Sequence, residues 1–208
     1  MNLKVVKMAG FFGIAAPILG FMMIFLAIRL SPWFSWTGNA LSDLGVSGLG
    51  AIIFNNGLLM TGSFMMVFFL GFFELSEGSQ LGRLGSGIFL MCAILLCAIG
   101  FFPETAGAIH QHVSVAFFVS IPIYKFVLGA FMVRNDMRKV GLLSFITGAS
   151  AVIVWMPAWS SFAIPEMITA LAVGVWSSVI GVWMRRIIVL GKDPSYVPGE
   201  RYGISDMV

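Results

Sequence analysis

A few acidic and basic side chains could do chemistry in a chain whose residues are 59% hydrophobic and 10% charged. Three of them are Asp43, Glu104 and His110. A histidine near carboxylates can act in general acid/base catalysis, or it can bind a divalent metal that keeps an open coordination position. We therefore take these three residues as candidate catalytic groups and as candidate metal ligands.

A second set of polar residues could bind a substrate beside these groups. Its members are Ser42, Asn55, Asn56, His112 and Arg29. A side-chain amide such as Asn55 or Asn56 can polarise a substrate carbonyl. Ordinary structural explanations also exist for several of these residues. Ser42 and Asp43 suit a turn or a helix cap, the two asparagines suit hydrogen bonds between helices, and Glu104 suits the first turn of a helix.

The two histidines are two residues apart, which places them about 200° apart around a helix. On a regular helix they cannot both bind one metal ion, so we expect at most one of them to face a pocket. His110 is favoured because it shares a helix face with Ser114 and lies closer to Glu104 in the sequence.

Six long apolar runs must position these polar residues. The runs cover residues 8–30, 51–73, 84–102, 109–133, 141–162 and 166–187. A hydrocarbon core about 30 Å thick needs roughly 20 helical residues to cross, and the runs lack the alternation of barrel strands. The sequence predicts an all-α, polytopic integral membrane protein, with a bundle of six transmembrane helices over residues 1–188 and a cytoplasmic tail over residues 189–208.

Positive charges predict the orientation of this bundle, because short loops rich in Lys and Arg stay in the cytoplasm. They gather at one predicted end: Lys4, Lys7, Arg83, Arg134, Arg138, Lys139, Arg185, Arg186, Lys192 and Arg201. We expect a multi-pass protein of the cell membrane with both termini cytoplasmic. The opposite end holds Asp43, Glu104 and Glu166 together with Asn55 and His110, which predicts a polar pocket at the extracytoplasmic interface.

Three residues inside or beside the runs need their own explanation. Glu166 follows Pro165 and suits the first turn of a helix, where a carboxylate meets the positive end of the dipole. Lys125 lies within the fourth run, so its amine must either reach toward the cytoplasmic end or find a buried partner. Pro122 and Pro157 predict helix kinks that shape a cavity.

Composition and charge make several classes of partner and cofactor improbable. The net charge is +3, and the basic residues are scattered over loops without an aromatic platform, so nucleic-acid binding is not predicted. Membrane lipids, including anionic lipids of the inner leaflet, are the expected partners. Haem, retinal and nucleotides are not indicated, and a divalent metal stays open. Cys92 and Cys97 lie about 140° apart on one predicted helix, so they are not expected to form a disulfide.

Three short strings carry a resemblance to a known family. They read NALSDLG, IFNNGLLMTG and GFFPETAGAIHQH. Together they resemble domain-of-unknown-function family 998, six-helix integral membrane proteins of prokaryotes. The resemblance implies a six-helix fold and no established activity. It also implies a distant similarity to the DRAM-like superfamily, some members of which are linked to lipid remodelling. Its characteristic positions correspond here to Ser42, Asp43, Asn55, Pro103 and His110.

Three functions of different classes follow from these observations. The first is a membrane-embedded lipid hydrolase or acyl transferase of the outer leaflet. In it His110 is the general base, Asp43 or Glu104 orients that base or holds a metal, and Asn55 or Asn56 polarises a carbonyl. The second is a lipid or small-molecule carrier or receptor that uses the same pocket without catalysis. The third is a membrane scaffold or regulator in which the polar residues are helix caps and packing contacts.

Overall fold

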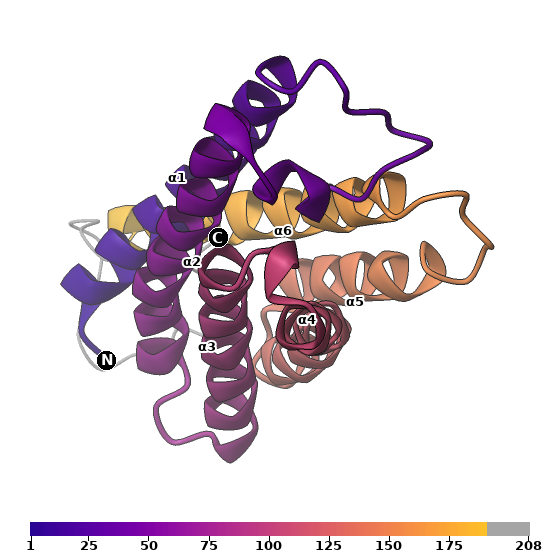
Figure 1. The fold of residues 1–208 in the computed structure, drawn as a ribbon. Coiled ribbons are helices and arrows are strands. Elements are labelled where there is room, and N and C mark those ends of the chain that lie inside the picture. Colours follow the sequence, from indigo (N-terminus) through magenta and orange to yellow (C-terminus); the bar gives the residue numbers. More distant parts are fainter. Residues whose placement is uncertain (191–208) are drawn as a thin grey trace, which may run out of the picture.

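The computed structural model describes residues 1–190, in which the chain is all-α (Figure 1). Two short 3-10 helices, η1 and η2, precede α2 and α4. The elements are α1 (Leu3–Arg29), η1 (Ser42–Gly45), α2 (Gly48–Leu75), α3 (Gln80–Phe101), η2 (Glu104–Ala106), α4 (Ala108–Arg134), α5 (Arg138–Ile153) and α6 (Ala163–Leu190). The predicted tail, with Lys192 and Arg201, lies outside the described residues except for the end of α6.

The long helices coincide with five of the six predicted runs. Within residues 1–190, α1, α2, α3, α4 and α6 are long and apolar enough to cross a membrane. Each of these helices begins a few residues before its predicted run and ends within a few residues of the predicted end. Charged and small residues at the ends of an apolar run can still form helical hydrogen bonds. The all-α class and a multi-pass membrane protein are therefore confirmed.

The fifth helix is shorter than predicted, and this part of the prediction was wrong. Helix α5 ends at Ile153 and has 16 residues, whereas the apolar run continues to residue 162. Pro157 explains the difference, because the residue before a proline is disfavoured in the α conformation and proline offers no N–H group. Pro157 thus follows the end of a helix instead of kinking one, while Pro122 does lie inside α4.

Polar contacts stabilise the irregular segment between α5 and α6. The indole N–H of Trp159 donates to the carbonyl oxygen of Val154 at 2.7 Å. The indole N–H of Trp155 donates to Thr169 Oγ1 at 3.1 Å, which joins the segment to α6. Non-helical backbone within a membrane must be satisfied by protein groups, and Trp159 does this for the Val154 carbonyl, whereas Trp155 holds the segment against α6.

The helices pack in sequence order, and α6 returns to close the bundle against α1. Each of α1 to α5 contacts the next helix, and α1 and α6 pack together along their lengths. A Cβ atom on Gly181 would lie 2.5 Å from the carbonyl oxygen of Gly10, and one on Gly10 would lie 2.7 Å from the oxygen of Gly181. The absence of a side chain at both positions is what lets the two backbones approach.

An aromatic cluster fills the centre of the bundle where α2, α3, α4 and α6 meet. Its members are Phe68, Phe72, Phe89, Tyr124 and Trp176, all fully buried. Phe72 stacks on Trp176 with ring centroids 5.4 Å apart, and Phe89 meets Tyr124 edge to face at 5.1 Å. The indole N–H of Trp176 donates to Ser144 Oγ at 2.8 Å, so α5 is tied to the same cluster.

Lys125 joins this cluster and does not reach toward the cytoplasmic end. Its side chain is fully buried, and Nζ donates to the carbonyl oxygen of Ala172 at 3.0 Å. Nζ also lies 5.4 Å from the ring centroid of Trp176. Of the two alternatives that the sequence left open, the buried partner is therefore the one observed.

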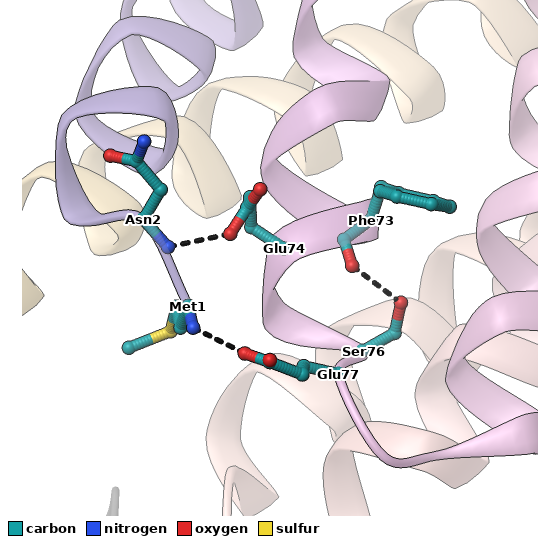
Figure 2. Close-up of polar contacts among 6 residues, drawn as sticks. All are labelled: Met1, Asn2, Phe73, Glu74, Ser76 and Glu77. Carbon is teal, nitrogen blue, oxygen red and sulfur yellow. Dashed lines mark hydrogen bonds and ion pairs between the residues drawn. The ribbon is translucent and has the colours of Figure 1, made fainter.

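Contacts between the start of α1 and the end of α2 stabilise the end of the bundle that holds most of the cations. Figure 2 shows the amino group of Met1 against the Glu77 carboxylate and the backbone N–H of Asn2 donating to Glu74 at 2.5 Å. Nearby, Ser76 Oγ donates to the carbonyl oxygen of Phe73 at 3.0 Å. These acidic side chains sit at a helix N-terminus, where their charge stabilises the free N–H groups of α1.

Candidate functional site

An apolar cavity of about 130 Å³ lies between the helices in the outer half of the bundle, meaning the half with the long loop after α1. It is partly open. Most of its wall is apolar, and its polar members come from four different elements: Ser42, Thr61, Ser114, Glu166 and Ser177. Residues of α1, α2, α3, α4 and α6 all contribute to the wall. The cavity is thus a product of the whole bundle and not of one helix pair.

The loop after α1 reaches toward the start of α6 (Figure 1). Leu41 and Ser42 at the end of this loop line the cavity. Leu44 in η1 is fully buried, and Asn55 of α2 anchors η1 by donating from Nδ2 to the carbonyl oxygen of Gly45 at 3.0 Å. Asp43 accepts from Asn39 Nδ2 at 2.7 Å and from the backbone N–H of Ala40 at 3.0 Å. Hydrogen bonds from residues three and four positions earlier to the Asp43 carboxylate therefore shape the segment that carries Ser42 and Asp43.

Asp43 and Glu104 form a coupled carboxyl pair between η1 and η2. Burial, the hydrogen bond to Asp43 and its negative charge together raise the pKa of Glu104 to about 7. Burial opposes ionisation of Asp43 as well, but hydrogen bonds from Glu104, Asn39 and Ala40 outweigh it and lower the Asp43 pKa. Of the two carboxyl groups, Glu104 therefore keeps its proton to the higher pH, and its buried Oε2 has no hydrogen-bond partner among the described residues.

Glu166 is the third carboxyl group at this end, and it lines the cavity directly. It lies in the first turn of α6, as the sequence predicted, and it also accepts a hydrogen bond from the backbone N–H of Leu41 at 2.6 Å. The backbone N–H of Ala163 donates to the carbonyl oxygen of Asn39 at 3.0 Å. Two hydrogen bonds between residues more than 120 positions apart thus fix α6 to the loop that covers the cavity.

His110 is buried at the start of α4, and both of its ring nitrogens are engaged. Nδ1 lies 2.7 Å from the carbonyl oxygen of Phe102, which can only accept, so Nδ1 carries the proton. Nε2 is then an acceptor, and Ser114 Oγ lies 3.3 Å from it. Ser114 lines the cavity. The partners of His110 are therefore a backbone carbonyl and a serine hydroxyl, and the structure places neither Asp43 nor Glu104 in hydrogen-bond contact with it.

Three of the predicted substrate-binding residues lie away from the cavity. Asn56 is exposed and donates to the carbonyl oxygen of Ile52 in its own helix at 2.7 Å. His112 is exposed, with Nδ1 2.6 Å from the carbonyl oxygen of Ala108. Arg29 is exposed, and within residues 1–190 it forms no ion pair. The structure thus brings together Ser42, Asp43, Glu104 and, through the loop, Asn55.

The described residues offer no metal centre. Nowhere in residues 1–190 do three or more His, Cys, Asp or Glu side chains lie so that they could hold a metal ion. The polar contacts at the site are the hydrogen bonds that Asp43 and Glu166 accept and the Ser114 to His110 contact.

Ser114 and Thr61 belong to the site although neither was among the predicted site residues, and Ser114 was noted only for sharing a helix face with His110. Most hydroxyls inside these helices donate back to a carbonyl one turn earlier, as Ser86 and Thr147 do. Ser114 instead contacts His110, and buried Thr61 Oγ1 has no hydrogen-bond partner in the described part of the chain. The spacing of four residues between His110 and Ser114 was the available signal. Nothing local marks Thr61, because its exposure to the cavity depends on distant helices.

Comparison with known proteins assigns the chain to a family. A family model described as "Protein of unknown function (DUF998)" matches residues 14–183. The match covers well over half of the sequence, so the chain belongs to the DUF998 family, as its three short strings indicated. No curated protein and no solved structure matches it.

Proposed function

We propose that this DUF998 protein binds a membrane amphiphile at its outer end, with an apolar segment of the ligand in the cavity and a polar head against the carboxyl groups. The observation that supports this proposal is an apolar cavity whose outer end carries Ser42 and Glu166. Asp43 and Glu104 lie just beyond them. Such a combination of apolar wall and a few convergent polar groups is typical of small-molecule sites.

The size of the cavity favours an occupant. Cavities of about 150 Å³ with apolar walls stay dry and bind molecules the size of benzene. The volume therefore suits a few methylene groups or a branched chain end, while the remainder of a lipid chain would lie between the helices and the bilayer.

The polar end selects for a head that donates hydrogen bonds. The three carboxyl groups, Asp43, Glu104 and Glu166, all lie within reach of one another's charge. Among residues 1–190, no Lys or Arg forms an ion pair with any of them. A ligand with an amine or hydroxyl head would satisfy these acceptors, whereas an anionic head would be repelled.

We also propose that α5 completes six membrane spans, with both termini in the cytoplasm. The support is the distribution of cations, because Lys4, Arg83, Arg134 and Arg138 all lie at the end of the bundle opposite the cavity. This orientation places the cavity and its carboxyl groups at the extracytoplasmic interface.

Native mass spectrometry of protein purified gently with its own lipids tests the binding proposal. We expect the wild-type protein to retain a specific amphiphile and an Ala170→Phe variant to lose most of it. Ala170 lines the cavity on α6, and a phenyl ring there would fill much of the free volume. An amphiphile retained equally by both proteins would contradict the proposal.

A matched control separates cavity filling from general damage. Ala116 is exposed on α4 and does not line the cavity, so Ala116→Phe makes the same chemical change on the lipid-facing side. We expect Ala116→Phe to retain the amphiphile as the wild type does. Glu166→Gln keeps the shape of the polar end and removes its charge, so we expect it to weaken retention of an amine-bearing ligand in particular.

A lipid hydrolase or acyl transferase is the second candidate, and the Ser114 to His110 contact favours it. With Nδ1 held by the Phe102 carbonyl, Nε2 can accept the Ser114 proton while Oγ attacks an ester carbonyl. Binding stands first because acyl transfer also needs donors aimed at the oxyanion, and the neighbours of Ser114 in the cavity wall on α4 are Phe117 and Phe118. Ser114→Ala in the same preparations separates the two functions. If the protein is an acyl transferase or hydrolase, the variant should form no product. If it only binds, the variant should retain as much amphiphile as the wild type.

A further inference from the structure

A second cavity lies at the opposite end of the bundle, between the start of α5 and the C-terminal half of α6. Its volume is about 520 Å³, about four times that of the outer cavity and within the range of ligand pockets. No residue of the outer site contributes to its wall. A ligand of this groove is therefore independent of the function proposed above.

The polar side of the groove is strongly cationic. Arg138, Lys139 and Arg186 line it, and all three are exposed. Asp136 is the acidic member of the lining, and its pairing with Arg138 is weak, since the two side chains are 4.0 Å apart and largely exposed. The groove thus carries an excess of two positive charges.

The first turn of α5 adds to this positive field. Helix α5 begins at Arg138, has no acidic residue in its first turn, and its N-cap residue Met137 makes no side-chain hydrogen bond to the helix. The N–H groups of a first helical turn have no partner in the helix and carry the positive end of the dipole. An anion seated beside Arg138 and Lys139 would therefore meet both side-chain cations and backbone donors.

The other side of the groove is apolar. Val140 of α5 and Val179, Val182 and Trp183 of α6 form it, and Val179 and Val182 are exposed. A soluble anion would leave this surface uncovered. A phospholipid covers it with the upper part of an acyl chain while its phosphate meets the cations, so charge and hydropathy together select one class of ligand.

We infer that this groove is a binding site for an anionic phospholipid, whose headgroup phosphate contacts Arg138, Lys139 and Arg186 and whose acyl chain lies along Val179 and Val182. Basic pockets between transmembrane helices at the cytoplasmic side are a known mode of headgroup recognition. The site differs from the outer cavity in the charge of the head that it accepts.

Lipid titration of the full chain in detergent micelles, followed by native mass spectrometry, tests the inference. Phosphatidylglycerol and phosphatidylcholine are added separately. We expect tighter binding of phosphatidylglycerol to the wild type, and a loss of at least about tenfold when Arg138, Lys139 and Arg186 are all changed to Gln. Phosphatidylcholine binding should be unchanged in that variant.

Two further variants keep the inference open to refutation. Lys4, Lys7 and Arg134 are exposed cations at the same end that do not line the groove, so changing them to Gln should leave phosphatidylglycerol affinity within about twofold of wild type. Val182→Trp keeps every charge and fills the apolar side, and it should release phosphatidylglycerol. Equal losses in the two triple variants, no lipid preference in the wild type, or unchanged binding by Val182→Trp would each overturn the assignment. Competition by soluble glycerol phosphate as strong as that by the lipid would also overturn it.

Discussion

Glu104 shows at the scale of one residue how neighbours decide a protonation state. The sequence predicted a helix first turn or a catalytic carboxylate, and it could not predict that Asp43 of a distant loop would raise the pKa of Glu104. The effect of Asp43 on the Glu104 pKa depends on the position of η1 against η2, which lies about 60 residues further along the chain. His110 was easier to predict, because the angle between residues i and i+2 already separated it from His112.

Stability should fall as the pH rises through the titration of Glu104. Its pKa in the folded protein is about 7, above the ordinary value of 4.5, so the stabilisation is complete below pH 4.5 and is lost between pH 4.5 and about 7. Glu104→Gln stays neutral throughout, and we expect it to lose this part of the pH dependence and to melt no lower than wild type at pH 8. Thermal melts from pH 4.5 to 8 measure the effect.

Glu77 provides a control of opposite sign. The contact with the Met1 amino group lowers the Glu77 pKa, so its contribution is present above pH 4.5 and is lost as the pH falls. Glu77→Gln should therefore leave the loss of stability between pH 4.5 and 7 intact. If Glu104→Gln and wild type show the same slope in that range, the pKa of Glu104 is not raised in the folded protein.

At the scale of elements, apolar runs predicted where helices lie but not where every helix ends. The run over residues 141–162 looked continuous because Trp155, Met156 and Trp159 are as apolar as the helix before them. One proline was enough to end α5, and the indole N–H of Trp159 then donated to the carbonyl oxygen of Val154. Contacts between helices were also predicted only in part. A glycine in the sequence indicates that another helix packs closely there, but it does not indicate which helix.

The crossing of α1 and α6 makes the sharpest prediction at this scale. Gly181→Ala places a methyl group 2.5 Å from the carbonyl oxygen of Gly10, so we expect a loss of about 1–3 kcal/mol of stability from overpacking. Gly87→Ala is the matched control, because nothing lies within 4 Å of its added Cβ in α3. Alanine favours helix over glycine by about 1 kcal/mol, so the control should be neutral or stabilised. Thermal melts in one detergent compare them.

At the scale of the whole molecule, hydrophobic runs and three short strings were sufficient for the class and the family. They were sufficient because membrane helices need long apolar segments whatever their neighbours are. A pocket at the outer end was predicted as polar, whereas its wall is mostly apolar. That wall, the closure of α6 on α1 and the hydrogen bond from Leu41 to Glu166 were beyond prediction, since each depends on residues more than 100 positions apart.

Labelling of single cysteines with a membrane-impermeant maleimide tests the proposed six spans. In a background with Cys92→Ala and Cys97→Ala, we expect Thr37→Cys and Ser160→Cys to react from outside intact cells. Lys139→Cys should react only after permeabilisation, because it lies among the cations at the other end. All three positions are exposed. Ser160→Cys reacting on the same side as Lys139→Cys would show that α5 does not cross.

The shortness of α5 has a consequence for the membrane around the protein. Sixteen residues span about 24 Å, several ångströms less than a hydrocarbon core of about 30 Å. If α5 crosses the bilayer, as proposed above, so short a helix would produce hydrophobic mismatch on its own flank of the bundle, and the bilayer there would thin to match it. The two leaflets would then lie nearer each other beside α5 than around the five longer helices, and a bilayer of less than average thickness would suit this protein best.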